Sequence, residues 1–277
     1  MGALVVAVVA TGAALTGAPP VPGAPRASPR VARAEPEWTA AVMLRAGAAR
    51  LAAAPSDRAL GLFTPAEDWA RPGTTIANLD SAPGSPYAPG QRVVALTFDD
   101  GPDPRYTPEV LQVLAADHAP ASFEIVGEHG ALYPGLLRQE VAEGMVLVDH
   151  TWTHADLSVL PAAAWVGEVD QTDALLQSIS GHPVRCLRPP QGRADAAVLG
   201  LLAARGLAEL SWDVDPSDYL RPPAGQLAAR VLAALHPGAV VVLHDGGGDR
   251  SQTVAALPAI VAGIRAAGYR IVPVCAG

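Results

Sequence analysis

VVALTFDDGPDP, at residues 93–104, changes from apolar residues to carboxylates and turn residues, and this change indicates where the first strand of the fold ends. An apolar run reaches Phe98, and two adjacent carboxylates, Asp99 and Asp100, follow at once before a Gly-Pro turn. The run predicts a buried strand, because strands covered on both faces read as continuous hydrophobic segments. Charges at the end of such a strand are costly to bury without a partner, and the pair therefore marks a candidate functional site.

Short apolar runs then alternate with segments rich in Ala and Leu, which predicts alternating strands and helices. Strands are expected at residues 92–98, 119–127, 145–149, 184–190, 207–214, 239–245 and 269–274. Helices are expected at residues 107–118, 130–144, 161–181, 194–206, 224–238 and 251–268. This alternation implies an α/β fold with a parallel sheet. No phosphate-binding GxGxxG motif follows the first strand, so barrel-like closure is favoured over an open nucleotide-binding sheet.

Capping residues are expected at the ends of several of these helices. Thr107 is assigned to the N-cap of the first helix, with Pro108 at its first helical position, N1. Gly181 is expected just past the end of a long helix. Asp245 and Asp249 are assigned to cap the helix that begins near residue 251.

The first 90 residues differ in composition from the rest of the chain. Residues 1–36 are interpreted as a signal peptide and linker, because their apolar run is shorter than the ~20 residues that span a bilayer. An uncleaved anchor or a wrongly assigned start Met would also fit. Residues 37–90 are interpreted as a partly ordered lead-in region, and residues 91–277 as the main domain. We expect a secreted or cell-envelope monomer with no membrane span once the signal is removed.

Charge and cysteine content restrict the partners and leave one question open. The 277-residue chain has a formal net charge of −8, which argues against a nucleic-acid partner. Cys186 and Cys275 could form a disulfide in an exported protein, or each could be a buried apolar residue. The sequence alone does not decide between these two states.

Reactive side chains follow the ends of most predicted strands. Asp99 and Asp100 follow the first strand, and His150 and His154 follow the third. Arg188 follows the fourth, Asp215 and Asp218 follow the fifth, and His244 and Asp245 follow the sixth. In a closed α/β barrel, the carboxyl ends of the strands meet at one rim, where the chemistry occurs. We therefore expect these groups to gather in a single site.

Two of these histidines and a carboxylate form a candidate metal site. His150 and His154 are four residues apart, a spacing that a helical turn would place on one face. Alone, such a pair is more often a solvated surface feature, and the two aspartates could include a simple turn cap. Two His and one Asp with an open position for water are typical of a catalytic divalent metal, with zinc preferred.

The other groups suit acid–base chemistry beside a metal. One of the two adjacent carboxylates would bind the ion, and the other would take a proton from a water whose pKa the metal lowers to about 7. His244 could protonate a leaving amine or alcohol. Arg188 and Asp218 are suited to hold a carboxylate and an imidazole in orientation.

Five motifs carry a resemblance to a known family. They are TFDDGP at 97–102, HTWTH at 150–154, RPPQG at 188–192, DPSDY at 215–219 and VVLHD at 241–245. In this order they resemble the motifs of the polysaccharide deacetylases, the NodB-like carbohydrate esterase family 4. The resemblance spans residues 92–277 and implies a distorted (β/α) barrel that removes acetyl groups from N-acetylglucosamine residues of a cell-wall or chitin-type glycan.

The resemblance also implies a role for each motif residue. Asp99 would be the general base, with Arg188 holding it, and His244 would be the general acid, tuned by Asp218. The implied ligands of a divalent metal, Zn²⁺ by preference, are Asp100, His150 and His154. The implied substrate-binding residues are Pro189, Gln191, Tyr219 and Val242, with the main-chain N–H of Gln191 in the oxyanion hole.

Several positions depart from the family pattern. Gln191 stands where an aromatic residue is usual, Tyr219 replaces Trp, and Val242 replaces Leu. Asp149, just before the first metal-site histidine, would either orient an imidazole or cap a turn. Glu124 stands at a position where an aromatic residue is expected, so it must either face solvent or pair with an arginine.

Two further functions are compatible with the same residues. An O-acetyl esterase acting on xylan would need the same water and oxyanion site, so sequence cannot separate it from an N-deacetylase. A non-catalytic glycan-binding module would explain the unusual residues Gln191, Glu124 and Val148, which stands where Gly is usual, but it would need neither Asp99 nor His244. Acetate release from a panel of glycans separates the three.

Overall fold

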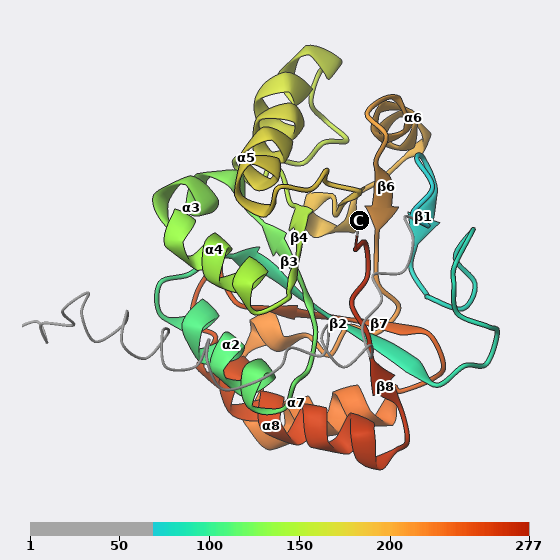
Figure 1. Cartoon of the computed structure of the whole chain (residues 1–277), viewed down its shortest axis with the longest axis vertical. Coiled ribbons are helices and arrows are strands. Elements are labelled where there is room, and N and C mark those ends of the chain that lie inside the picture. Colours follow the sequence, from blue (N-terminus) through green and yellow to red (C-terminus); the bar gives the residue numbers. More distant parts are fainter. Residues whose placement is uncertain (1–68, 277) are drawn as a thin grey trace, which may run out of the picture. The chain divides into compact units, whose positions relative to one another are not determined.

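A curled, all-parallel sheet forms the centre of the fold in the computed structural model, which describes residues 69–276 (Figure 1). Its strands are β1 (Thr75–Ile76), β2 (Val93–Gly101), β3 (Ser122–Ile125), β4 (Val146–Asp149), β5 (Cys186–Leu187), β6 (Ala208–Leu210), β7 (Ala239–His244) and β8 (Arg270–Ile271). Their order is β1-β6-β5-β4-β3-β2-β7, and β8 pairs with β2. The seven predicted strands and the distorted (β/α) barrel are confirmed.

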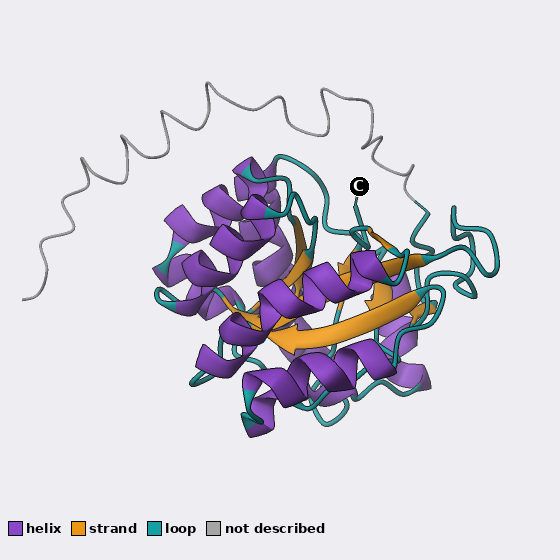
Figure 2. Cartoon of the chain, turned by 90° about the horizontal axis from the view of Figure 1, so that it is seen from below, coloured by secondary structure: helices purple, strands orange, loops and turns teal. Residues whose placement is uncertain are grey.

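The helices pack around this sheet (Figure 2). They are α2 (Tyr106–Ala116), α3 (Gly127–Leu132), α4 (Pro134–Ala142), α5 (Gln171–Ser180), α6 (Ala196–Ala204), α7 (Ala224–Ala233) and α8 (Ser251–Ala266). Shorter turns are η1 (Ala162–Ala164), η2 (Val166–Asp170), η3 (Pro190–Gly192) and η4 (Asp218–Leu220). The helix expected at 130–144 is divided at Pro134, which suits the first turn of a helix but not its interior. Gly181 ends α5 with a φ of 75°, as predicted.

Strand β1 was not predicted. It comes from the region interpreted as a partly ordered lead-in, and its two residues give too short a run to show any periodicity. It pairs with β6, and Ile76 in this strand is fully buried. A single bridge between Val214 and Val241 joins the end of the β6 segment to β7, so the sheet closes on itself.

Alternation along β2 explains why charged residues point into the barrel. Val94, Leu96 and Phe98 belong to the core that the outer helices cover, whereas Val93 and Ala95 belong to the cluster inside the barrel. Successive side chains of a strand point to opposite faces. The same alternation places residues 97 and 99 on the inner face. The strand therefore carries the carboxylate of Asp99 into the barrel.

Two capping predictions were wrong. Helix α2 begins at Tyr106, and the hydroxyl of Thr107 accepts a hydrogen bond from the Asp103 N–H at 2.8 Å and donates one to the Asp245 carboxylate. Asp245 is fully buried and does not cap α8. Asp249 does face the start of α8, where it accepts the N–H of residue 251 at 3.0 Å. The sequence suggests local helix caps for Thr107 and Asp245, whereas these two side chains bind each other across 138 positions of the chain.

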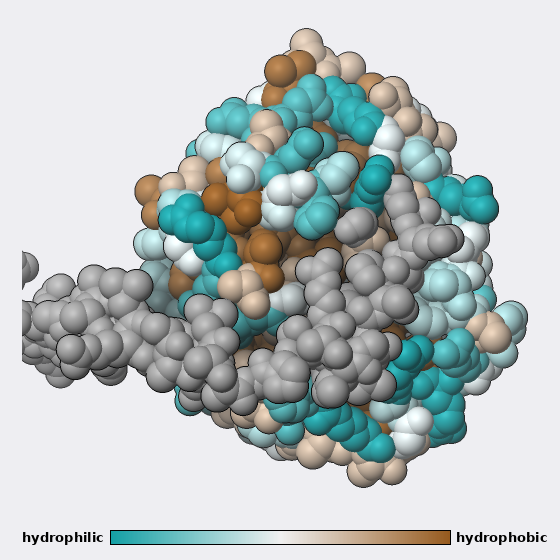
Figure 3. All heavy atoms as spheres, in the orientation of Figure 1, coloured by the Kyte–Doolittle hydropathy of each residue, from teal (hydrophilic) through white to brown (hydrophobic). Residues whose placement is uncertain are grey.

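The outer surface carries few large apolar groups. On the face seen in Figure 1, Figure 3 shows hydrophilic residues over much of the described surface, with hydrophobic residues in smaller groups. The exposed large hydrophobic residues are Leu132, Tyr133, Val159, Val166, Tyr219 and Leu220. None of the helices described between residues 69 and 276 is long and apolar enough to cross a membrane. The predicted signal peptide and linker lie outside the described residues.

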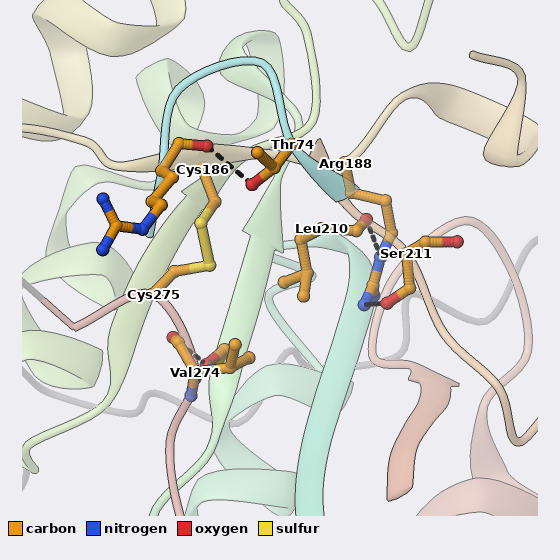
Figure 4. Close-up of a disulfide and its surroundings, with 9 residues drawn as sticks. Thr74, Cys186, Arg188, Leu210, Ser211, Val274 and Cys275 are labelled. Atoms are coloured by element: carbon orange, nitrogen blue, oxygen red, sulfur yellow. Dashed lines mark hydrogen bonds between the residues drawn. A yellow bond between two sulfur atoms is a disulfide. The ribbon is translucent and has the colours of Figure 1, made fainter. Parts of the chain in front are cut away.

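A disulfide ties the C-terminal segment to the interior of the barrel. The sulfurs of Cys186 and Cys275 are bonded, with their Cα atoms 5.9 Å apart, which answers the question left open by the sequence (Figure 4). Beside it, the Ser122 hydroxyl donates to the carbonyl of Val274 and accepts that residue's N–H. These contacts hold the end of the chain against β3 and β5.

Removing the disulfide is expected to lower stability. The bond closes a loop between residues 89 positions apart, and loops of this length contribute about 2–5 kcal/mol by restricting the unfolded chain. The free energy of unfolding of the Cys186→Ala/Cys275→Ala variant, measured by urea denaturation, should fall by that amount. Reduced wild-type protein should match the variant. Equal stability of the oxidised wild type and the variant would contradict this view.

Candidate active site

Most of the residues predicted from separate strand ends line one cleft of about 400 Å³, while the buried residues Arg188, Asp218 and Asp245 do not line it. Its lining residues are Asp99, Asp100, His150, His154, Gln191, Trp212, Asp215, Tyr219, Val242 and His244. They lie near the carboxyl ends of β2 and β7 or in the segments that follow β4, β5 and β6. The predicted convergence at one rim is therefore present.

Asp100, His150 and His154 form the metal-binding candidate of this cleft. One ligand atom from each lies within 4.8 Å of the others. The Nε2 atoms of His150 and His154 lie 3.5 and 3.3 Å from the same oxygen, Oδ1 of Asp100. Within the described residues, no other group of three such side chains has this geometry. The set offers two imidazole nitrogens and one carboxylate oxygen.

The hydrogen bonds of His150 show that the set fits a metal. Its Nδ1 lies 2.8 Å from the carbonyl oxygen of Arg188, which can only accept, so Nδ1 carries the proton. Nε2 then holds a bare lone pair, and this buried atom has no hydrogen-bond partner among the described residues. A metal ligand that donates its other ring N–H to a backbone carbonyl is the usual arrangement of such histidines.

Backbone geometry turns Asp100 toward the two histidines. The register of β2 and β3 shifts between Asp99 and Gly101, and Asp100 has a φ of 72°. This bulge interrupts the alternation of side chains along the strand, so the adjacent carboxylates of Asp99 and Asp100 lie against different neighbours. The imidazole of His129 donates to the Asp100 carbonyl at 2.9 Å.

A close approach by the β7–α8 loop makes a side chain impossible at two glycines beside Asp100. A Cβ at Gly246 would lie 2.0 Å from the Asp100 carbonyl oxygen, and a Cβ at Gly247 would lie 2.4 Å from its Oδ2. Both contacts are far below those of real Cβ atoms, so the loop requires glycine there.

Burial and charge set the protonation of Asp100 and His154. Burial would raise the pKa of Asp100, but its contact with His150 and the nearby histidine charges lower that pKa well below its ordinary value. Burial, together with the charge of His150, lowers the pKa of His154. Both shifts favour an ionised carboxylate and a neutral imidazole, which are the states that bind a metal.

Arg188 holds Asp99 from inside the barrel. The guanidinium is fully buried, and its Nη1 donates to Oδ1 of Asp99 at 2.5 Å. The Nε and Nη2 groups donate to the carbonyls of Leu210 and Ser211, both at 3.2 Å (Figure 4). Burial would raise the pKa of Asp99, but the charges of Arg188, His150 and His244 together lower it below its ordinary value. Asp99 is therefore an ionised carboxylate that faces the cleft.

His244 lies across the same cleft and is fixed by Asp218. Nδ1 of His244 donates to Oδ1 of Asp218 at 2.6 Å, and the other oxygen of Asp218 accepts the His244 N–H and the Thr253 hydroxyl. Burial would lower the pKa of His244, but the bond to Asp218 and the charge of Asp99 raise it to about 8. The imidazole is therefore protonated at neutral pH.

Three of the four predicted substrate-binding residues line the cleft, and the fourth, Pro189, does not. Gln191, Tyr219 and Val242 line the cleft, and Gln191 has a φ of 62° within η3. The ring of Tyr219 meets that of His244 edge-on, with centroids 5.9 Å apart. Pro189 is buried and is not among the residues that line the cleft.

Trp212 lines the cleft but was missed by sequence reasoning. It follows β6, and a Cβ on Gly192 would lie 2.7 Å from its ring, so η3 packs directly on it. The strand expected at residues 207–214 includes it, whereas β6 ends at Leu210, so no predicted strand end marked it. Asp215 was predicted to lie at the rim without an assigned role, and it also lines the cleft.

The alternatives left open for Asp149 are now decided. It is fully buried, and its Oδ1 accepts the N–H of Thr151 at 2.5 Å, so it caps the turn that leads into the metal-site loop. Burial raises its pKa well above the ordinary value. Asp149 thus orders the backbone beside His150 and does not contact an imidazole.

Comparison with known proteins identifies the family. Residues 87–210 match the Polysaccharide deacetylase family model. A Bradyrhizobium sp. chitooligosaccharide deacetylase is 41% identical over 196 residues, which are 66% of this chain and 90% of the relative. A Bacillus cereus peptidoglycan-N-acetylglucosamine deacetylase is 35% identical over 186 residues, 66% of this chain and 87% of the relative. The chain therefore belongs to the polysaccharide deacetylase family.

A solved structure supports the same assignment. The crystal structure of the Bc1960 peptidoglycan N-acetylglucosamine deacetylase superimposes with a TM-score of 0.67 and 27% sequence identity. The match covers 73% of this chain and 91% of that one. The family resemblance inferred from the five motifs is confirmed, and so is the class of enzyme, a deacetylase.

Replacing Asp218 by Asn is expected to lower the pKa of His244. The wild-type imidazole should titrate near 8 because Asp218 stabilises its charged form. In Asp218→Asn this pKa should fall toward the ordinary value of about 6.5. NMR titration of the imidazole in chelated, metal-free protein measures both values. Asp215→Asn, on the same loop, is the control and should leave the pKa nearly unchanged. An equal pKa in wild type and Asp218→Asn would show that Asp218 does not tune His244.

Proposed function

We propose that this protein is a metal-dependent hydrolase that removes acetyl groups from N-acetylglucosamine residues of a chitin-type or cell-wall glycan. The observation that carries the proposal is the meeting of one metal-binding set, one buried carboxylate and one protonated imidazole in a single cleft. The named relatives, a chitooligosaccharide deacetylase and a peptidoglycan deacetylase, support the same substrate class.

The proposed cofactor is a divalent cation, Zn²⁺ by preference, held by Asp100, His150 and His154. Two imidazoles and one carboxylate are a common donor set of catalytic zinc, with a position left open. When bound, such a cation supplies Lewis-acid chemistry, polarising the acetyl carbonyl and making a water more acidic.

Asp99 and His244 supply the proton transfers in this proposal. Asp99, kept ionised by Arg188, accepts the proton of the water whose oxygen attacks the acetyl carbonyl carbon. The carbon–nitrogen bond then breaks, and its electron pair stays on nitrogen. That nitrogen takes a proton from His244, which Asp218 keeps charged. The products are acetate and the free amino sugar.

The walls of the cleft would bind the sugar. Tyr219 is 48% exposed and presents a ring face large enough for a pyranose, while Trp212 forms part of the wall that packs on η3. The main-chain N–H of Gln191 is proposed to stabilise the negative charge that forms on the carbonyl oxygen. Val242, 3% exposed, would border the acetyl methyl group. Pro189 would act only by shaping this loop.

We further propose that the protein acts outside the cytoplasm as a monomer. Its relatives are named for glycans of the kind found in cell walls and chitin-type oligomers. The apolar N-terminal run fits an export signal. The proposed partner is thus an acetylated polysaccharide and not a nucleic acid, in line with the net charge of −8.

Metal-loaded protein is expected to release acetate from N-acetylated chitooligosaccharides or peptidoglycan. A chelator should abolish the release, and added Zn²⁺ should restore it. Asp99→Asn should lower kcat by a factor of about 10²–10⁴, as expected for loss of a general base, while the variant still binds one metal per chain. Glu109→Gln, on the exposed side of α2, is the control and should retain full activity.

The same assay separates the alternative functions. Faster acetate release from acetylated xylan than from the N-acetylated glycans would indicate an O-acetyl esterase. Glycan binding without any turnover in zinc-saturated protein would indicate a non-catalytic module, and would overturn the proposal.

A further inference from the structure

Glu124 is a buried carboxyl directly behind Asp99. It lies on β3 in register with Asp99 on β2, and its side chain is fully buried. Oε2 lies 3.4 Å from Nη1 of Arg188, the same group that holds Asp99. The alternative left open by the sequence is decided: Glu124 pairs with an arginine and does not face solvent.

The charges around Arg188 do not balance if every carboxyl is ionised. One guanidinium faces the carboxyl groups of Asp99, Glu124 and Glu209. Glu209 accepts a hydrogen bond from Thr75 at 2.5 Å, and Asp99 accepts one from Arg188. Neither oxygen of Glu124 accepts a hydrogen bond from any donor in the described part of the chain. An ionised carboxylate in this state would be costly to bury.

Glu124 is therefore the group that retains a proton. Burial raises its pKa well above the ordinary value, and although Arg188 lowers it, the charge of Asp99 raises it again. Asp99 and Glu124 are register partners on β2 and β3, and both lie beside Nη1 of Arg188. Two neighbouring buried carboxyl groups do not both ionise readily, so one of them retains a proton. A neutral Glu124 has an O–H donor, and Asp99 is the acceptor on the adjacent strand.

We propose that Glu124 is a positioning residue for the deacetylation reaction: as a neutral acid on β3, it donates a hydrogen bond to Asp99 and fixes the orientation of that carboxylate. The inference rests on the proposed role of Asp99 as the proton acceptor. Arg188 fixes one oxygen of Asp99, and Oδ2 lies 3.9 Å from Nε2 of His150, on the metal side. A second donor from the neighbouring strand would hold the plane of the carboxylate without adding positive charge.

Two substitutions of Glu124 separate a hydrogen-bond donor from a space-filling side chain. Glu124→Gln is neutral, has nearly the same shape and retains a donor, so its kcat should stay within about threefold of wild type. Glu124→Leu fills the space without a donor, so kcat should fall by about tenfold or more while KM changes little, as expected for loss of one hydrogen bond to a charged group. Thermal unfolding and metal content are measured on each variant.

Glu140 provides the matched control. It is also a fully buried glutamate, and neither of its carboxyl oxygens has a hydrogen-bond partner among the described residues, but it lies in α4 and not at the cleft. Glu140→Leu should change stability without lowering kcat. This separates a general effect of removing a buried acid from an effect on Asp99.

Infrared difference spectra test the protonation state without reference to activity. The wild-type protein at neutral pH should show the carbonyl stretch of a neutral carboxyl that is absent from Glu124→Gln. The inference is overturned if this band is missing, if Glu124→Leu has wild-type kcat, or if Glu124→Gln loses as much kcat as Glu124→Leu. Failure of the wild-type enzyme to release acetate would instead overturn the proposed function, and the infrared band would still report on Glu124.

Discussion

The interactions of Arg188 connect Asp99 and His150, two residues from different strands of the candidate site. Its guanidinium donates to Asp99 on β2 and to carbonyls that follow β6, and its own carbonyl accepts the Nδ1 proton of His150. One residue therefore orients both the proposed proton acceptor and a proposed metal ligand. Removing only the arginine would leave buried carboxylates without a counter-charge, which typically costs several kcal/mol. The fold and the chemistry thus depend on the same contacts.

The placement of Arg188 follows from short elements that need outside support. Strand β5 has only two residues, and Arg188 comes directly after it. Cys186 at its start is bonded to Cys275, so the C-terminal segment restrains the strand that carries the arginine. The neighbouring strands supply the rest through parallel pairing with β4 and β6. A site built this way keeps its geometry because several elements fix each side chain.

Most of the fold and the cleft could be predicted because they follow from local patterns. Strand ends are visible as apolar runs that stop at Asp99, His150 or His244, and parallel strands bring their carboxyl ends to one rim. What could not be predicted depends on contacts between distant segments. The partner of Thr107 is Asp245, 138 residues away, and that of His129 is the backbone at Asp100. Strand β1 is too short to show a period.

In the proposed mechanism, Asp100, His150 and His154 hold a single cation between Asp99 and His244. Anomalous diffraction from crystals grown with Zn²⁺ tests this arrangement most directly. We expect one strong peak in the cleft, bonded to a carboxylate oxygen of Asp100 and to Nε2 of both histidines. An ion bound elsewhere with these three side chains unliganded, or no ion in zinc-saturated crystals, would contradict the account.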